Sequence, residues 1–142
     1  MKRLAQQVVE KAERAVDQLR DRSNDRLDYS ESSLSVVEEI LSEATEFVDH
    51  APVKQIDVLV NMLGSYILEV GRREFGGKYY WHEGHDQPVL VIGEPEFKIA
   101  MLACDKVRGR LSGDLQASIP LFYRGFAEHV RDAEPGADAI YV

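Results

Sequence analysis

Apolar residues recur at intervals of three or four along most of the chain, which is the spacing of one face of an α-helix. The pattern predicts about five helices, over residues 2–22, 31–48, 53–74, 95–111 and 118–130. Ser30 and Pro95 occupy positions that favour a helix start. The broadest apolar stripe lies in residues 53–74, which we therefore expect to form the central helix.

Residues 78–92 follow a different pattern. Apolar and polar side chains alternate over Lys78–His82, and a β-branched run covers Val89–Ile92, with Gly84 and Pro88 between them. This order is typical of a β-hairpin, and the segment 139–142 is a candidate third strand. Strands that are neighbours in sequence favour the α+β class, with helices packed around a small antiparallel β-hairpin or three-stranded sheet.

Gly64 and Gly71 lie seven residues apart, so they face the same side of the expected central helix. Each glycine costs about 1 kcal/mol relative to alanine in a helix interior. We therefore predict that another helix or the sheet crosses close to both positions. The pair Gly76–Gly77 marks the end of this helix.

The composition of the 142 residues, 44% hydrophobic and 30% charged, is that of one globular domain covering residues 1–142. Residues 1–24 are either a peripheral helix or a dimerising one, which leaves a homodimer open. They lack the continuous apolar centre of a secretory signal, and no apolar run is long enough to span a bilayer. Cys104 is the single cysteine and has no partner for a disulfide, so we expect a buried thiol and a cytoplasmic location.

The net charge of −8 would repel phosphate backbones, which argues against nucleic-acid binding. The same charge suits a basic protein partner. The alternative is that the acidity serves solubility alone.

Polar side chains cluster at the end of the expected central helix. Tyr66, Glu69, Arg72 and Arg73 fall within two turns, and Glu69 precedes Arg73 by four residues, the favourable order for an ion pair. The cluster is either a pocket for a polar ligand or a structural network that ties the helix to the hairpin. The second interpretation is the favoured one.

The hairpin carries a second set of candidate binding residues: Tyr80, Trp81 and His82. Exposed tyrosine and tryptophan are favoured in protein interfaces. His82, His85 and Asp86 are of metal-ligand types, but their spacing does not match a known zinc motif, so a solvated turn is the simpler reading. No phosphate-binding loop or nucleophile elbow is present, and we predict neither a cofactor nor a metal.

Two stretches carry a resemblance. Residues 26–41 contain Leu-Asp-Tyr-Ser-x-x-Ser-Leu, and residues 63–81 contain a version of Gly-x-Tyr-x-Gly-Glu-Val-x-Arg-Arg followed by Gly-Gly and an aromatic residue. With these motifs the chain resembles an uncharacterised family of small bacterial proteins, although Leu68 replaces the usual second glycine. The resemblance implies no activity. Some such proteins belong to toxin–immunity or contact-dependent systems.

Two functions follow as hypotheses. The first is a non-enzymatic bacterial interaction protein, such as an immunity protein or adaptor, that binds a basic protein through an acidic surface. The second is a small-ligand-binding protein or small enzyme with a polar pocket around Tyr66, Glu69 and Arg73.

Overall fold

The computed structural model describes residues 3–142 and confirms the α+β class. The described residues form six α-helices: α1 (Leu4–Gln18), α2 (Arg20–Ser23), α3 (Leu34–Ala44), α4 (Val53–Phe75), α5 (Cys104–Leu111) and α6 (Ile119–Arg131). Their four strands are β1 (Lys78–His82), β2 (Gln87–Ile92), β3 (Lys98–Met101) and β4 (Asp138–Tyr141). Short 3₁₀ turns at Glu31–Ser33 and Val48–His50 flank α3.

The strands form one sheet in the order β1-β2-β3-β4. The predicted hairpin is confirmed as β1 and β2, and the predicted C-terminal strand as β4. The sheet has one strand more than expected, and it is mixed, because β4 pairs with β3 in the parallel direction. The register of the strands determines which side chains share a face of the sheet. Tyr80 pairs with Val89, and Val91, Ala100 and Ile140 are aligned across β2, β3 and β4.

The prediction of a helix from Pro95 is wrong. Residues Lys98–Met101 form β3, and the helix begins only at Cys104. Ile99 and Met101 belong to the main core, whereas Ala100 lies in a separate cluster on the opposite face. This apolar run is too short for a helical period of apolar residues to be distinguished from an extended one. Gly93 (φ +96°) opens the tight turn before β3, where the Phe97 ring packs on it.

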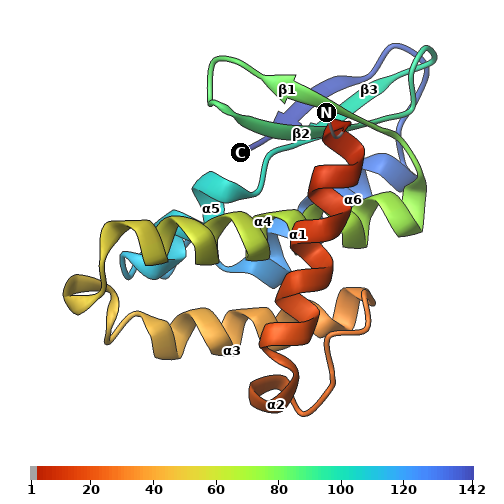
Figure 1. The fold of residues 1–142 in the computed structure, drawn as a ribbon. Helices are drawn as coiled ribbons and strands as arrows, with labels where there is room; N and C mark the ends of the chain where they lie inside the picture. Colours follow the sequence, from red (N-terminus) through yellow and green to blue (C-terminus); the bar gives the residue numbers. More distant parts are fainter. Residues whose placement is uncertain (1–2) are drawn as a thin grey trace.

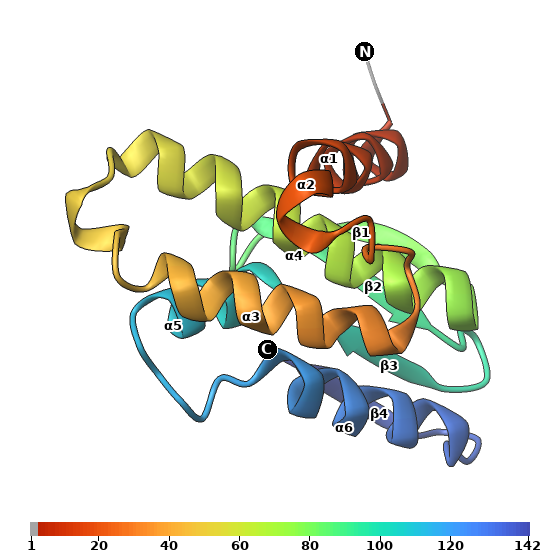
Figure 2. The same cartoon turned by 90° about the horizontal axis from the view of Figure 1, so that it is seen from below.

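All helices lie on one side of the sheet (Figure 1). α4 and α6 pack against β2 and β3, and α3 packs beneath them against α5 and α6 (Figure 2). Helix α1 crosses α4, and its Val8, Ala12 and Ala15 are buried there. The amphipathic N-terminal segment thus covers the helix layer of its own chain, and its role in a dimer stays a prediction.

A partly buried charge pair joins three of the helices. Arg110 of α5 donates a hydrogen bond to Glu38 of α3, and the backbone N–H of Ile119, at the start of α6, donates to the other oxygen of the same carboxylate at 3.0 Å. The Glu38 carboxylate therefore neutralises the arginine and also satisfies a free N–H of the helix terminus.

The close approaches predicted at Gly64 and Gly71 are confirmed. A Cβ on Gly64 would lie 2.7 Å from the Cys104 Sγ and 3.4 Å from the Cys104 Cα. A Cβ on Gly71 would meet Leu90 of β2 at 3.0 Å and Met101 of β3 at 3.3 Å. Gly64 allows the start of α5 to approach α4, and Gly71 allows the sheet to do so. Helix α4 is therefore the element against which both are packed.

We expect Gly64→Ala to destabilise the protein by about 1–2 kcal/mol, because overpacking against Cys104 outweighs the gain in helix propensity. Gly109→Ala in α5 is the matched control, since its Cβ would meet Ala117 at an ordinary 3.5 Å. This variant should be as stable as the wild type or more stable by up to about 1 kcal/mol. Urea denaturation measures both effects. Adding Cys104→Ala to Gly64→Ala should restore most of the loss, and equal stability of the two glycine variants would contradict the close packing.

Candidate functional site

The Glu69 carboxylate lies at the centre of a buried polar network between α4 and β1. Its side chain is fully buried. Arg72 donates from Nε to Oε2 at 2.5 Å and from Nη2 to Oε1 at 2.9 Å, and the Tyr79 hydroxyl donates to Oε2 at 2.6 Å. The predicted ion pair with Arg73 is present at 3.6 Å, but Arg72 is the closer partner. The network ties the end of the central helix to the first strand.

The protonation of this network follows from its geometry. Burial by itself would raise the pKa of Glu69, but the hydrogen bonds from Arg72 and Tyr79 and the two arginine charges outweigh it and lower the pKa. Burial and the neighbouring carboxylate raise the pKa of the Tyr79 hydroxyl. Glu69 is therefore an anion and Tyr79 a neutral donor, each stabilised in the state that the contacts require.

A second polar group continues from Arg73 to the segment before α3. The Arg73 guanidinium lies 3.5 Å from the centroid of the Tyr29 ring, and this ring stacks on Tyr66 at 4.9 Å. The Tyr66 hydroxyl accepts a hydrogen bond from the Tyr29 N–H at 2.9 Å and pairs with the Ser33 hydroxyl at 2.6 Å. Tyr29 has a φ of +66°, unusual for a bulky residue, and these contacts hold it there.

The arrangement favours the structural interpretation of the Tyr66–Arg73 cluster. Tyr66 and Glu69 are fully buried, and their polar atoms are occupied by neighbouring groups. A hollow between α1 and β1 reaches the network, but Arg72 and Tyr79 line it and Tyr66 and Glu69 do not. A ligand in this hollow would contact one edge of the network and not its centre.

Tyr80 and His82 lie on the face of the sheet that faces away from the helices, whereas the alternation of β1 places Trp81 on the side of Tyr79. We call the face that carries Tyr80 the open face, because no helix of the described residues covers it (Figure 1). Its floor is a cluster of apolar residues from β2, β3 and the residue after β3, each at most 5% exposed because neighbouring side chains cover it: Val89, Val91, Ala100 and Leu102. Tyr80 of β1 (45% exposed) and Ile140 of β4 (50% exposed) stand on either side of this floor.

The open face is hollowed. A cavity of about 460 Å³ lies over the floor, and its lining includes Tyr80, Trp81, His82, Lys98 and Ile140. Trp81 is half exposed. Of the seven predicted binding residues, Tyr80, Trp81 and His82 contribute to the lining of this cavity, and the other four belong to the two connected polar groups around Glu69 and Tyr66.

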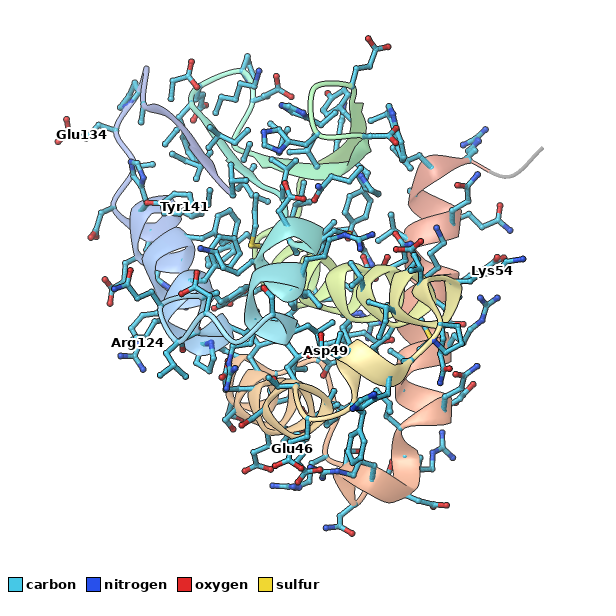
Figure 3. The ribbon with its side chains drawn as sticks, turned by 90° about the vertical axis from the view of Figure 1, so that its left-hand side faces the viewer. Glu46, Asp49, Lys54, Arg124, Glu134 and Tyr141 are labelled. Carbon is cyan, nitrogen blue, oxygen red and sulfur yellow. The ribbon has the colours of Figure 1, made fainter. Side chains whose placement is uncertain are left out.

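Exposed acidic side chains lie in the segments next to the strands, and two of them, Glu94 and Asp138, line the cavity of the open face; we call this set the acidic rim. They lie in the β1–β2 and β2–β3 loops, in the segment before β4 and at the first residue of β4: Glu83, Asp86, Glu94, Glu96, Asp132, Glu134 and Asp138. All are exposed, and Figure 3 shows Glu134 projecting outward beside the sheet. Lys78 and Lys98 are the lysines within residues 78–102 and 132–142, which hold no arginine. The hydroxyl of Tyr80 donates a hydrogen bond to the Glu94 carboxylate at 3.1 Å, which links Tyr80 to this rim.

The hairpin loop has the character of a solvated turn. Asp86 has a φ of +52°, and the His85 N–H donates to Nδ1 of His82 at 3.1 Å. His85 pairs through its own Nδ1 with Asp105 at 2.8 Å, a partner from α5 that local sequence did not indicate. Residues 3–142 contain no group of three or more His, Cys, Asp or Glu side chains placed to hold a metal ion.

Cys104 is buried, as expected. Its backbone N–H donates to Oε1 of Gln87 at 3.1 Å, and burial raises the pKa of the thiol to about 11. The side chain is therefore a neutral packing group at neutral pH. Within the described part of the chain, no helix has the length and apolar content that crossing a bilayer requires.

Comparison with protein-family models, curated proteins and solved structures finds no match. The resemblance over residues 26–81 therefore stays a prediction. The structure does bring its two motifs together, since Tyr29 and Ser33 of the first contact Tyr66 and Arg73 of the second.

Replacing Glu69 by glutamine tests the charge at the centre of the network. We expect Glu69→Gln to lose about 1–3 kcal/mol of stability at pH 7, because two arginines lose their buried anion. The folded-state pKa lies below the ordinary 4.5, so this contribution is present above pH 4.5 and fades as the pH falls through the lowered pKa. Urea denaturation of the wild type and of Glu69→Gln between pH 7 and pH 3 should show that the difference between their free energies of unfolding becomes smaller as the pH falls. The control is Glu46→Gln on the surface (Figure 3), which should change the free energy of unfolding by less than about 0.5 kcal/mol. If the stability lost in Glu69→Gln did not change with pH, a lowered pKa of Glu69 would be contradicted.

The two stacked tyrosines provide a matched pair of variants. Tyr66→Phe leaves the Tyr29 N–H and the Ser33 hydroxyl without their partner and should lose about 1–3 kcal/mol. The buried Tyr29 hydroxyl has no hydrogen-bond partner among residues 3–142, so Tyr29→Phe should leave the stability unchanged or raise it by up to about 1 kcal/mol. Thermal and urea unfolding measure both. Equal losses in the two variants would show that the hydroxyl of Tyr29 has a role of its own.

Proposed function

We propose that this chain is a non-enzymatic binding protein and that its open face recognises a basic protein partner. The observation that carries the proposal is the coincidence of a hollowed apolar floor with an acidic rim. A partner that covers this face buries the exposed parts of Tyr80 and Ile140, and the charges of the acidic rim set orientation and association rate. Tyr80 supplies half-exposed aromatic surface of the kind that such interfaces favour.

The charge also limits the partners. A rim of seven carboxylates with two lysines disfavours a nucleic acid or an anionic lipid surface. A lone, buried and protonated cysteine suits a reducing compartment, and we place the protein in the cytoplasm. The resemblance over residues 26–81 extends the proposal to a bacterial immunity protein or adaptor.

A small ligand is the second candidate, and the cavity volume favours it. The hollow of about 460 Å³ lies within the range of known ligand sites, and its lining mixes an apolar floor with His82, Lys98 and Glu94. This site differs from the pocket around Tyr66, Glu69 and Arg73 that the sequence suggested. Binding there would use the open face and leave the buried network intact.

Site-directed photo-crosslinking tests the proposal. A benzophenone amino acid replaces Tyr80 or Ile140 on the open face, or Leu121 of α6 (64% exposed) as the control. When an extract of the native host that contains these variants is irradiated, we expect one protein to be crosslinked from positions 80 and 140 and not from position 121. Raising the salt of the extract to about 0.5 M should reduce the yield, because screening weakens the attraction to the acidic rim.

The control decides between the outcomes. Crosslinking from position 121 to the same protein, or no defined adduct from positions 80 and 140, would contradict a partner on the open face. A partner whose yield does not depend on salt would contradict the role of the acidic rim.

A further inference from the structure

Strand β4 is the last strand on its side of the sheet, and half of its backbone groups face away from β3. The N–H of Lys98 donates to the C=O of Ala137, and the N–H of Leu102 donates to the C=O of Tyr141, both at 2.8 Å. Because the bonds of a parallel ladder come from alternate residues, every second residue from Ala137 to Tyr141 faces β3. The others direct their N–H and C=O groups outward, where no strand of residues 3–142 pairs with them: Asp138, Ile140 and Val142.

An unpaired edge of this kind is a template for one more strand. We propose that β4 pairs with an extended segment of the partner that has apolar residues in its middle and lysine or arginine at one end. This inference rests on the proposed function, since it names the element through which the basic partner docks beside the open face.

The opposite edge of the sheet is less accessible. Helix α1 packs beside β1, and residues of both line the hollow between them. Lys78 is part of β1, and lysine on an edge strand opposes pairing with another chain. In β4 the sole charged side chain is that of Asp138, the first residue of the strand. Strand β4 is therefore the edge at which pairing is expected.

The side chains of β4 indicate what the middle of the added segment contains. Ile140 is 50% exposed and Val142 is 38% exposed. Both lie on the face of the sheet that carries Ala100, because side chains alternate along a strand. A paired strand would place its own side chains about 4.5–5.5 Å from theirs. Apolar residues in those positions would remove the exposed area of Ile140 and Val142 from water.

Carboxylates gather at one end of this edge. Strands β3 and β4 are parallel and begin at the same end of the sheet, where the Gly136 N–H donates to the Glu96 C=O at 2.8 Å. Lys98 is the single basic residue of segments 94–98 and 132–142. A segment along β4 would thus meet negative charge at one end, which lysine or arginine would complement. The exposed acidic residues at this end are Glu94, Glu96, Glu134 and Asp138.

The charge disfavours a second copy of this chain as the added strand. Residues 132–142 contain no lysine or arginine, so a second β4 strand would bring no positive charge to these carboxylates. Each copy also carries a net charge of −8, and two copies repel each other. A basic segment adds attraction where a second copy adds repulsion.

Peptide binding tests the inference. The two probes are ten-residue peptides, blocked at both termini, in which alternating valine and threonine residues are followed or preceded by three lysines. They cover antiparallel and parallel pairing. One control has glutamate in place of lysine. The other two carry N-methyl groups on one or the other alternate set of residues, which removes the N–H donors from one edge of the peptide. Titration followed by ¹⁵N chemical shifts gives the affinity and the location.

We expect one lysine peptide to bind and to shift the amide resonances of residues 138–142 most strongly. Its glutamate version should bind at least tenfold more weakly, because the carboxylates repel it. N-methylation of the alternate set that faces β4 should abolish binding, since the hydrogen bonds to the edge are lost. N-methylation of the other set should change the affinity by less than about threefold.

Ile140→Pro is the matched change in the protein. The Ile140 N–H faces outward, so proline removes a free donor and leaves the bonds to β3 in place. This variant should bind the peptide at least tenfold more weakly. Ile140→Val keeps the N–H and a β-branched side chain and should weaken binding by less than about threefold. Circular dichroism checks that both variants fold, and the N-methyl comparison decides if the proline variant does not.

Equal binding of the lysine and glutamate peptides, or equal effects of the two N-methyl sets, would overturn the strand proposal. So would shifts confined to elements other than β3 and β4, or no binding at millimolar concentration. A dimer of the free protein that Ile140→Pro converts to a monomer would also overturn it, because a second copy would then occupy the edge. In each case a salt-dependent adduct from positions 80 and 140 would still support a protein partner on the open face, so the two proposals fail separately.

Discussion

The arrangement of this protein depends on a buried anion. The Glu69 carboxylate has no access to solvent, and an unpaired charge in that position would be prohibitively unfavourable. Arg72 and Tyr79 together supply three hydrogen bonds, and Arg73 adds a second positive charge. Because Tyr79 belongs to β1, the requirement to neutralise one side chain of α4 fixes where the sheet begins.

The same requirement extends to the segment that enters α3. Arg73 is held between Glu69 and the ring of Tyr29, and Tyr29 stacks on Tyr66. The backbone of Tyr29 adopts a left-handed conformation that only dense local contacts maintain. Residues that resemble the components of an active site in sequence thus form a chain of contacts from β1 through α4 to the segment before α3. Their polar and charged groups bind one another.

The sequence predicted this central region well because its signals are local. Helical spacing located α4, two glycines located its close contacts, and the i,i+4 spacing of Glu69 and Arg73 indicated their ion pair. The partners Tyr29 and Tyr79, and the His85–Asp105 pair, come from other elements, and no local pattern assigns them. Strand β3 could not be predicted either, because its four residues are too few to distinguish the helical period of apolar residues from the extended one.

The alternation of one strand links the buried network to the open face. Tyr79 points inward to Glu69, and the next residue, Tyr80, stands on the opposite side beside Val89. A strand held from beneath by a charged hydrogen bond has little freedom to move its outward side chains. The Tyr80 ring on the open face is therefore held in place by the network on the other side of the same strand. The floor beneath that ring is itself packed, since Val89, Val91, Ala100 and Leu102 are at most 5% exposed, so the two faces of the sheet are fixed by different means: a charged hydrogen-bond network on the inside and apolar side chains under Tyr80 on the outside.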